Sequence, residues 1–513
     1  MDLVRLTEDN VDNICGKPIF CVEYSPAYFK DLAERFPQIT DSVAGCFDNA
    51  ARNQGVKDFW GRSIKVKGLS ELADVSGEAV LLITSDYFWE VYDSLNTNRE
   101  INNLFTAVYY FPNRETEIDL SYRERYANEP LRDILLFRSG PHASGYVPGT
   151  DFNDNARALF EYLLRNGYNE RYQLVWLVHD PAEYVKKYQS VKNVSFIPYD
   201  GALTDDLAVR EEYYRALCLA RYIFFTDAYG FARNARKDQI RVQLWHGCGI
   251  KRRVNFVPCE KRYEYTTVIS KLYADLHARD YGLRADQMLV TGYPKEDWLF
   301  HPRNDWREVL DIPAADKYIF WLPTFRTAGV NGLKNLDEQA EMTETGLPVA
   351  GSFQDLDLLE ECLAELEVVL IVKLHPFQDR SKIGFRQRPH IVLLENSRLC
   401  QSDIQINELL GHAAALISDY SSAAIDYTIL NRPIAFTLDD YEVYGENRGF
   451  NWPDVRNWLP GREIFDFAEF LQFVKEVAAG VDVEKDKRER LARLFHDFFD
   501  DKSSERIVKV LGI

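Results

Sequence analysis

His246 stands where a predicted strand, residues 241–245, gives way to glycines and cations. The segment 246–253 reads His-Gly-Cys-Gly-Ile-Lys-Arg-Arg, with Lys251 as the first cation. Glycines let backbone N–H groups approach an anion closely, and Lys and Arg suit phosphate. Histidine titrates near neutral pH, so it can also accept a proton there. We therefore interpret this segment as part of a phosphate site; the simpler alternative is a buried histidine beside a tight turn.

Two other predicted strands, both of them apolar runs, are followed by groups that suit a phosphate. Lys373 and His375 follow the run 368–372, and their spacing places them on one face of a strand. Thr324 and Arg326 follow an earlier run of the same kind. A guanidinium there could clamp a phosphate through two hydrogen bonds. Each segment alone is only suggestive.

A serine-rich turn follows a further apolar run. It reads Ser-Asp-Tyr-Ser-Ser over 418–422 and leads into an apolar stretch that contains Asp426. Ser421 or Ser422 could cap a helix at this point, and the positive end of a helix attracts anions. Ordinary serine capping explains the turn taken alone. Because ligands of open parallel sheets lie at the carboxyl ends of strands, several such ends with phosphate chemistry favour one shared site.

The elements that must position these groups predict an α/β fold. Continuous apolar runs, rather than alternation, indicate strands covered on both faces. We predict an N-terminal Rossmann-like accessory domain at 1–125 and a charged linker at 112–131. Two further α/β domains are expected at 131–300 and 301–490. Residues 491–513 belong to a charged helical tail that could pack back across the other domain.

Composition narrows the function classes. The 513 residues carry a net charge of −19, which argues against a duplex nucleic-acid partner. Eight cysteines without a CxxC pair fit reduced thiols, and the start has no signal pattern. No apolar run is long enough to span a bilayer. No GxxxxGK[ST] or HExxH motif occurs, so neither a metal nor a cofactor is expected.

Taken in order, these segments resemble the CDP-glycerol glycerophosphotransferase family, the polymerases and primases of teichoic acids and related capsules. The resemblance covers about residues 131–500. It rests on the following ordered set: Trp245-His246-Gly247 with Lys251, Gly292-Tyr293-Pro294, Pro323 to Arg326, Lys373 to Pro376, Ser418 to Ser422, Asp426-Tyr427, and Asn431-Arg432-Pro433. The order is specific, although each piece is weak.

The resemblance implies a GT-B-like pair of Rossmann-like domains facing a cleft, with the nucleotide donor held mainly by the second domain. It implies transfer of glycerol phosphate, or a related polyol phosphate, from a CDP-alcohol to a teichoic-acid-like, capsular or lipid-linked acceptor, with release of CMP. His246 and His375 would be the two functional histidines, with His246 as general base. The substrate-binding residues expected are Lys251, Thr324, Arg326, Lys373, Ser418, Asp419, Ser421, Ser422 and Asp426.

This sequence departs from the family after Trp-His-Gly, where Ser or Thr and then Pro are usual and Cys248 and Gly249 stand here. The acceptor and the transferred alcohol therefore stay open. A GT-B glycosyltransferase using a nucleotide sugar, or a binding protein without turnover, is an alternative. We expect a cytoplasmic location, and the family's substrates are compatible with peripheral contact at the inner face of the membrane.

Overall fold

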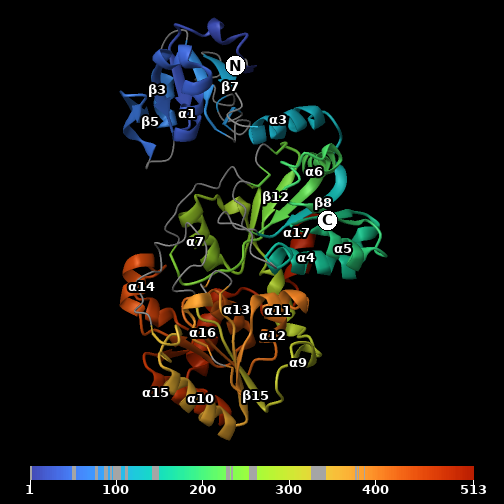
Figure 1. Ribbon diagram of the computed structural model, residues 1–513, viewed down its shortest axis with the longest axis vertical. Helices are drawn as coiled ribbons and strands as arrows, with labels where there is room; N and C mark the ends of the chain where they lie inside the picture. Colours follow the sequence, from blue (N-terminus) through green and yellow to red (C-terminus); the bar gives the residue numbers. More distant parts are fainter. Residues whose placement is uncertain are drawn as a thin grey trace. The chain divides into compact units, whose positions relative to one another are not determined.

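The computed structural model is drawn in Figure 1. It describes residues 3–48, 53–75, 79–85, 91–92, 95, 105–109, 114–140, 150–226, 231–232, 235–252, 263–324, 343–375, 378, 380–385 and 387–513. Arg326, one of the predicted site residues, lies outside these ranges. The chain divides into two compact units. Unit 1 comprises Met1–Arg132, Tyr199–Arg221 and Gly230–Gln239, and unit 2 comprises the rest.

Unit 1 is built on a sheet whose described strands follow the order β1-β7-β6-β2-β3-β5-β4. In this sheet the described strand pairs are parallel, except β4 and β5, which form an antiparallel pair. The strands are β1 Leu3–Arg5, β2 Ile19–Val22, β3 Val43–Phe47, β4 Gly55–Phe59, β5 Arg62–Lys67, β6 Ala79–Ile83 and β7 Phe105–Tyr109; the helices include α1 Pro26–Arg35, α3 Arg114–Tyr126 and α6 Leu207–Leu219.

The linker predicted at 112–131 is wrong, because most of it is the helix α3. Arg123 and Asp119, one turn apart on α3, form a buried ion pair at 3.0 Å. Tyr122 stacks on Tyr214 of α6 with ring centroids 4.4 Å apart. Some of the charges that suggested a solvated linker therefore pair with each other within the helix, and the Tyr122 ring packs on α6.

Unit 2 contains two sheets, and the strand pairs described in them are parallel. The first has the order β10-β9-β8-β11-β12-β13-β14. Its strands are β8 Arg132–Arg138, β9 Gln173–Val178, β10 Val194–Pro198, β11 Ala220–Phe225, β12 Ile240–Gln243, β13 Tyr265–Val268 and β14 Met288–Val290; nearby helices are α4 Asp154–Arg165, α5 Pro181–Tyr188, α7 Lys271–Tyr281 and α8 Asp297–Phe300.

The second sheet has the order β17-β16-β15-β18-β19-β20. Its strands are β15 Lys317–Trp321, β16 Val368–Val372, β17 Ile391–Leu393, β18 Ala415–Ser418, β19 Ile434–Thr437 and β20 Arg462–Ile464. The helices are α9 Trp306–Val309, α10 Phe353–Glu365, α11 Asn396–Gln401, α12 Ile406–Leu410, α13 Ala423–Tyr427, α14 Tyr441–Arg448, α15 Phe467–Ala478, α16 Lys485–Phe495 and α17 Ser503–Leu511. The expectation of an α/β fold with parallel sheets is confirmed.

Both sheets of unit 2 follow the winding of nucleotide-binding folds. Each starts in the middle, adds two strands on one side and then continues on the other. The order therefore reverses between β8 and β11 in the first sheet and between β15 and β18 in the second. Sheets of this kind bind ligands beyond the carboxyl ends of their strands, where the order reverses. All five residues of β16 are buried, as its unbroken apolar sequence predicts.

The helix α17 completes the core of the first sheet, although it follows the second sheet in sequence. Ile507, Val508 and Leu511 are buried in the cluster that contains the aromatic residues of β8 and β9. Figure 1 shows this red helix beside the teal helix α4. The backbone N–H groups of Ser503 and Ser504 donate to the Asp297 carboxylate at 2.9 and 3.0 Å, which fixes the start of α17.

Replacing Ile507, which has no exposed surface, tests this packing. We expect Ile507→Ala to lower the free energy of unfolding by about 2–5 kcal/mol, because it leaves a cavity in the core. Val510→Ala on the same helix is the control, since Val510 is 59% exposed, and it should change little. Urea unfolding of the two variants measures the difference, and equal effects would contradict this role of α17.

Candidate functional site

The strand order of the second sheet reverses between β15 and β18, and hydrogen bonds join the segments at the carboxyl ends of these two strands. The Thr324 backbone N–H and hydroxyl, after β15, both donate to Asp419 Oδ2, at 2.8 and 2.9 Å. Asp419 Oδ1 accepts from the Tyr420 N–H at 2.6 Å. The Ser418 hydroxyl donates to the Leu322 carbonyl at 3.2 Å.

These contacts show what two of the predicted site residues do within the protein. The side chains of Ser418 and Asp419 have no exposed surface, and their hydrogen bonds shape the loops between β15 and β18. Asp419 can be buried because its carboxylate accepts hydrogen bonds from backbone N–H groups that would otherwise have no partner at the strand ends. Thr324 is almost as buried, and its hydroxyl serves the same contact.

Lys373 and His375 follow β16, the neighbour of β15 on the side away from β18. The Lys373 N–H extends the ladder by donating to the Trp321 carbonyl at 2.9 Å. Burial lowers the pKa of the Lys373 ammonium to about 8. A cation that titrates so close to neutral pH lies at the carboxyl end of this sheet.

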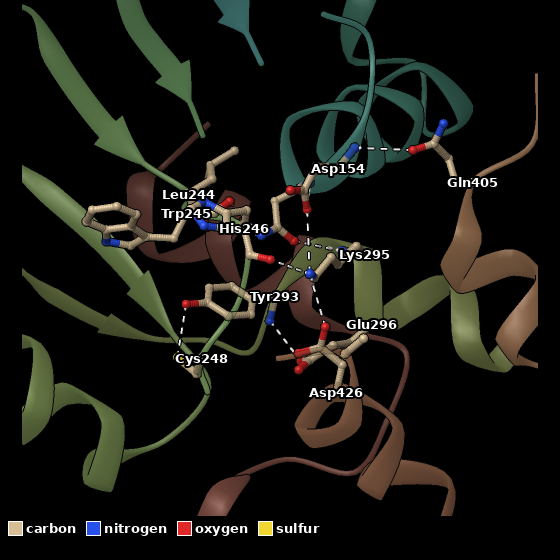
Figure 2. A network of polar contacts seen from close by, with 12 residues as sticks. Asp154, Leu244, Trp245, His246, Cys248, Tyr293, Lys295, Glu296, Gln405 and Asp426 are labelled. Carbon is tan, nitrogen blue, oxygen red and sulfur yellow. Dashed lines mark hydrogen bonds and ion pairs between the residues drawn. The ribbon is translucent and has the colours of Figure 1, made fainter. Parts of the chain in front are cut away.

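The backbone that carries His246 is held by two side chains from elsewhere in the first sheet's half. Asn155 Nδ2 donates to the carbonyls of Leu244 and Trp245, at 3.1 and 2.9 Å. Lys295 Nζ donates to the His246 carbonyl at 2.5 Å. Figure 2 shows Lys295 pointing between His246, Asp154 and Asp426.

Lys295 links the two halves of unit 2 through a buried ion pair. Its Nζ lies 3.0 Å from Asp426 Oδ2, on α13 of the second sheet, and 3.7 Å from Asp154 Oδ1. Burial alone would lower the pKa of this ammonium, but the two carboxylates raise it above its usual value. Lys295 is therefore charged at neutral pH, and Asp426 is its principal partner.

Two buried titratable groups lie beside this pair. Burial raises the pKa of Glu296 well above its usual value, and the nearby Asp426 raises it further. Burial lowers the pKa of His496 to about 4, and its ring Nε2 lies 3.0 Å from the Ile425 carbonyl. Both shifts favour the uncharged forms of these side chains.

Glycine permits a close approach between the loop after β12 and the turn after β18. A Cβ on Gly247, whose φ is +153°, would lie 2.3 Å from Ser422 Oγ and 2.8 Å from its Cβ. A Cβ on Gly249 would lie 3.4 Å from Ser422 Cβ. In this structure the glycines therefore accommodate Ser422, a protein group, where the sequence suggested an anion.

The helix expected after this turn is short. It comprises α13, five residues long, which passes into a 3₁₀ turn at Thr428–Leu430. The Ser421 hydroxyl accepts from the Ala423 N–H at 3.3 Å, so Ser421 and not Ser422 provides the capping contact. A short helix offers little dipole, and any anion here depends on individual N–H and hydroxyl groups instead.

Lys251 lies against the segment that ends α14. It forms an isolated antiparallel bridge with Phe450, and its Nζ lies 5.6 Å from the centre of the Tyr444 ring. Tyr444 in turn stacks on Tyr420 at 3.8 Å. Lys251 is thus brought to the turn that holds Ser421 and Ser422.

The structure joins some of the predicted residues and not others. His246, Lys251, Ser422 and Asp426 belong to one set of contacts between the two halves of unit 2. Thr324, Ser418 and Asp419 form a second set within one sheet. Lys373 and His375 follow β16, which is separated from β18 by β15.

Sequence reasoning missed Lys295 and Asn155. Lys295 directly follows the Gly-Tyr-Pro segment that carries part of the resemblance, so its position was a usable signal. Asn155 lies in the first turn of a predicted helix, where Asn and Asp are usual caps. Nothing local shows that this amide instead reaches two carbonyls of a distant strand.

Within the described ranges, no group of three or more His, Cys, Asp or Glu side chains could hold a metal ion. Among the residues that the structure describes, no helix is both long and apolar enough to cross a membrane.

The family described as CDP-glycerol:poly(glycerophosphate) glycerophosphotransferase matches residues 146–512 of this chain. A teichoic acid ribitol-phosphate primase of Bacillus spizizenii is 25% identical over 325 residues, which cover 58% of this chain and 76% of that protein. The teichoic acid ribitol-phosphate polymerase TarK of Staphylococcus aureus is 26% identical over 314 residues. That match covers 57% of this chain and only 56% of the polymerase, so the chain spans about half of that relative.

A solved structure of the wall teichoic acid polymerase TagF has a similar fold. It superposes with a TM-score of 0.58 at 18% identity, over 78% of this chain and 96% of the TagF chain. At this identity the likeness concerns the fold.

The contact between Gly247 and Ser422 can be tested by adding one methyl group. We expect Gly247→Ala to cost about 1–3 kcal/mol of unfolding free energy through overpacking, beyond the strain of its positive φ. Gly480→Ala is the control, because Gly480 has a φ of +72° and nothing within 4 Å of the added Cβ. Adding Ser422→Gly should recover part of the loss in urea unfolding; no recovery would mean that the two loops do not touch.

Proposed function

The chain belongs to the family of CDP-glycerol:poly(glycerophosphate) glycerophosphotransferases, and we propose that it transfers a polyol phosphate from a CDP-alcohol to a polymer hydroxyl, with release of CMP. One observation carries this proposal beyond membership of a transferase family. The loop that bears His246 and the turn that bears Ser422 follow strands of two different parallel sheets, yet they touch. A general base and a set of phosphate-binding groups can thereby act on one substrate.

The same contact supports a GT-B-like arrangement. In this proposal residues 131–300 form the acceptor domain and residues 301–490 form the CDP-donor domain. Residues 491–513 return to the first of these, and residues 1–125 are an accessory domain. The matching strand orders of the two sheets and the packing of α17 support this division.

In the proposed reaction an acceptor hydroxyl attacks the phosphorus that bears the alcohol. The bond from that phosphorus to the bridging oxygen breaks, and CMP leaves with the bonding electrons. His246 accepts the proton of the attacking hydroxyl, as general base. Lys373, His375 and Arg326 offset the charge of the diphosphate, and the turn at Ser421 and Ser422 holds the leaving phosphate through N–H and hydroxyl groups.

The alcohol is glycerol or a close relative. The names of similar proteins include a ribitol-phosphate primase of Bacillus spizizenii and a glycerol-phosphate transferase of Staphylococcus aureus, so both polyols are candidates. The acceptor is a teichoic-acid-like or capsular polymer, or a lipid-linked saccharide. A lipid-linked acceptor would bring the enzyme to the cytoplasmic face of the membrane as a peripheral protein.

His246→Ala should reduce CMP release by about 10²–10⁴-fold while donor binding stays nearly intact, because the variant loses only the proton acceptor. CMP release from CDP-glycerol and CDP-ribitol, beside UDP- and CMP-sugars, measures the reaction. Isothermal titration with the donor measures binding. His390→Ala is the control, since His390 precedes β17 and its ring bonds to Glu360 at 2.8 Å. Normal turnover of His246→Ala would remove His246 from the mechanism, and release from a sugar nucleotide alone would indicate a glycosyltransferase.

The pKa of Lys373, lowered by burial to about 8, predicts a pH dependence. The ammonium is charged below that pH and neutral above it, so its attraction for the diphosphate is lost as the pH rises. We expect kcat/KM for the donor to fall above pH 8, because this ratio reports the ionisation of the free enzyme. In Lys373→Met this alkaline limb should be absent. An unchanged limb in that variant would exclude Lys373 as its source.

A further inference from the structure

The backbone just before His246 is held in a costly conformation. Trp245 has a φ of +53°, in the left-handed region that side chains other than glycine rarely adopt. Such a backbone is strained and persists only where its surroundings over-determine it. Here the surroundings are visible, because three successive carbonyls, of residues 244–246, accept hydrogen bonds from Asn155 and Lys295.

Lys295 differs from Asn155 in reaching both halves of unit 2. In the first half its ammonium contacts the His246 carbonyl and lies 3.7 Å from Asp154, and in the second half it contacts the carboxylate of Asp426. Asp426 belongs to α13, which begins just after Ser422. A single buried side chain, 8% exposed, therefore joins the backbone of the proposed base to the helix behind the phosphate-binding turn.

Stability alone does not account for this ion pair. Apolar residues of similar volume often replace a buried ion pair with no loss of stability, whereas removing one partner leaves a costly unpaired charge. The hydrogen bonds of an ammonium weaken as the partner moves away or out of line, whereas an apolar contact tolerates such shifts. The arrangement is suited to setting the position of two loops relative to one another.

From these contacts we infer that Lys295 is a positioning residue for the reaction proposed above. It does not touch the reacting atoms. It holds the His246 backbone and, through Asp426, the turn at Ser421 and Ser422 in one geometry, so that the base reaches the hydroxyl that attacks the phosphorus in line with the leaving oxygen. The inference rests on the proposed function.

Three variants separate positioning from stability. Lys295→Met removes the ammonium and leaves Asp426 unpaired. The double variant Lys295→Met/Asp426→Leu removes both charges and fills the space. Lys317→Met is the matched control, since Lys317 Nζ also donates to two carbonyls, those of Val477 and Ala478 at 2.9 and 2.7 Å, far along the chain from either loop. Urea unfolding, kcat and donor KM are measured for each.

We expect kcat of Lys295→Met to fall about 10²-fold with little change in donor KM, because a displacement of about 1 Å at a reacting group costs that much. In the double variant the unfolding midpoint should return towards that of the wild type while kcat stays low. Lys317→Met should keep the wild-type kcat. A merely structural lysine would not separate the two readouts in this way.

The inference is overturned if kcat of the double variant recovers together with its stability, or if donor KM rises while kcat is unchanged. If Lys295→Met does not fold, the double variant decides alone, since it removes the buried charge of Asp426 together with its partner, and the Asp154 side chain is 20% exposed to solvent. Failure of the proposed function gives a different result. The wild-type enzyme would then release no CMP from any CDP-alcohol, before any variant is compared.

Discussion

The burial of one ammonium group governs how the two halves of unit 2 meet. Removing a charge from water costs several kcal/mol unless an opposite charge and hydrogen bonds replace the solvent. For Lys295 these are the Asp426 carboxylate and the His246 carbonyl, which belong to different sheets. Any sliding of one sheet past the other separates the ammonium from one of them. The glycines that allow contact with Ser422, and the left-handed Trp245, lie in the same loop as the His246 carbonyl that the ammonium contacts.

The groups around the ion pair have pKa values shifted towards their uncharged forms. Glu296 lies beside Asp426 and His496 lies beside Ile425, and burial shifts the pKa of each in that direction. Asp154 is a second carboxylate at 3.7 Å from the ammonium, so most of the attraction comes from Asp426 at 3.0 Å. The outer loops, by contrast, are joined by stacking and backbone bonds, as Lys251, Tyr444 and Tyr420 show.

The sequence predicts the local part of this structure well. Unbroken apolar runs such as residues 368–372 identify parallel strands, and the rule that ligands lie at carboxyl ends brings Thr324 and Asp419 together correctly. It misses contacts that a side chain makes at a distance. The charges of α3 resemble those of a linker because their partners lie one turn away or on another helix. Lys295 and Asp426 are far apart in sequence, and no pattern in either segment predicts that they form an ion pair.

The packing of α17 has a consequence for how the chain is made. The core of the first sheet of unit 2 contains Ile507, Val508 and Leu511, while the strands of that sheet lie between residues 132 and 290. On the ribosome these strands emerge long before the helix that covers them. The second sheet, whose core draws on residues 319–477, can close earlier in synthesis. Domains usually fold in the order in which they leave the ribosome, but part of the apolar surface of the first sheet stays exposed until residues 503–511 have been made, after the core residues of the second sheet.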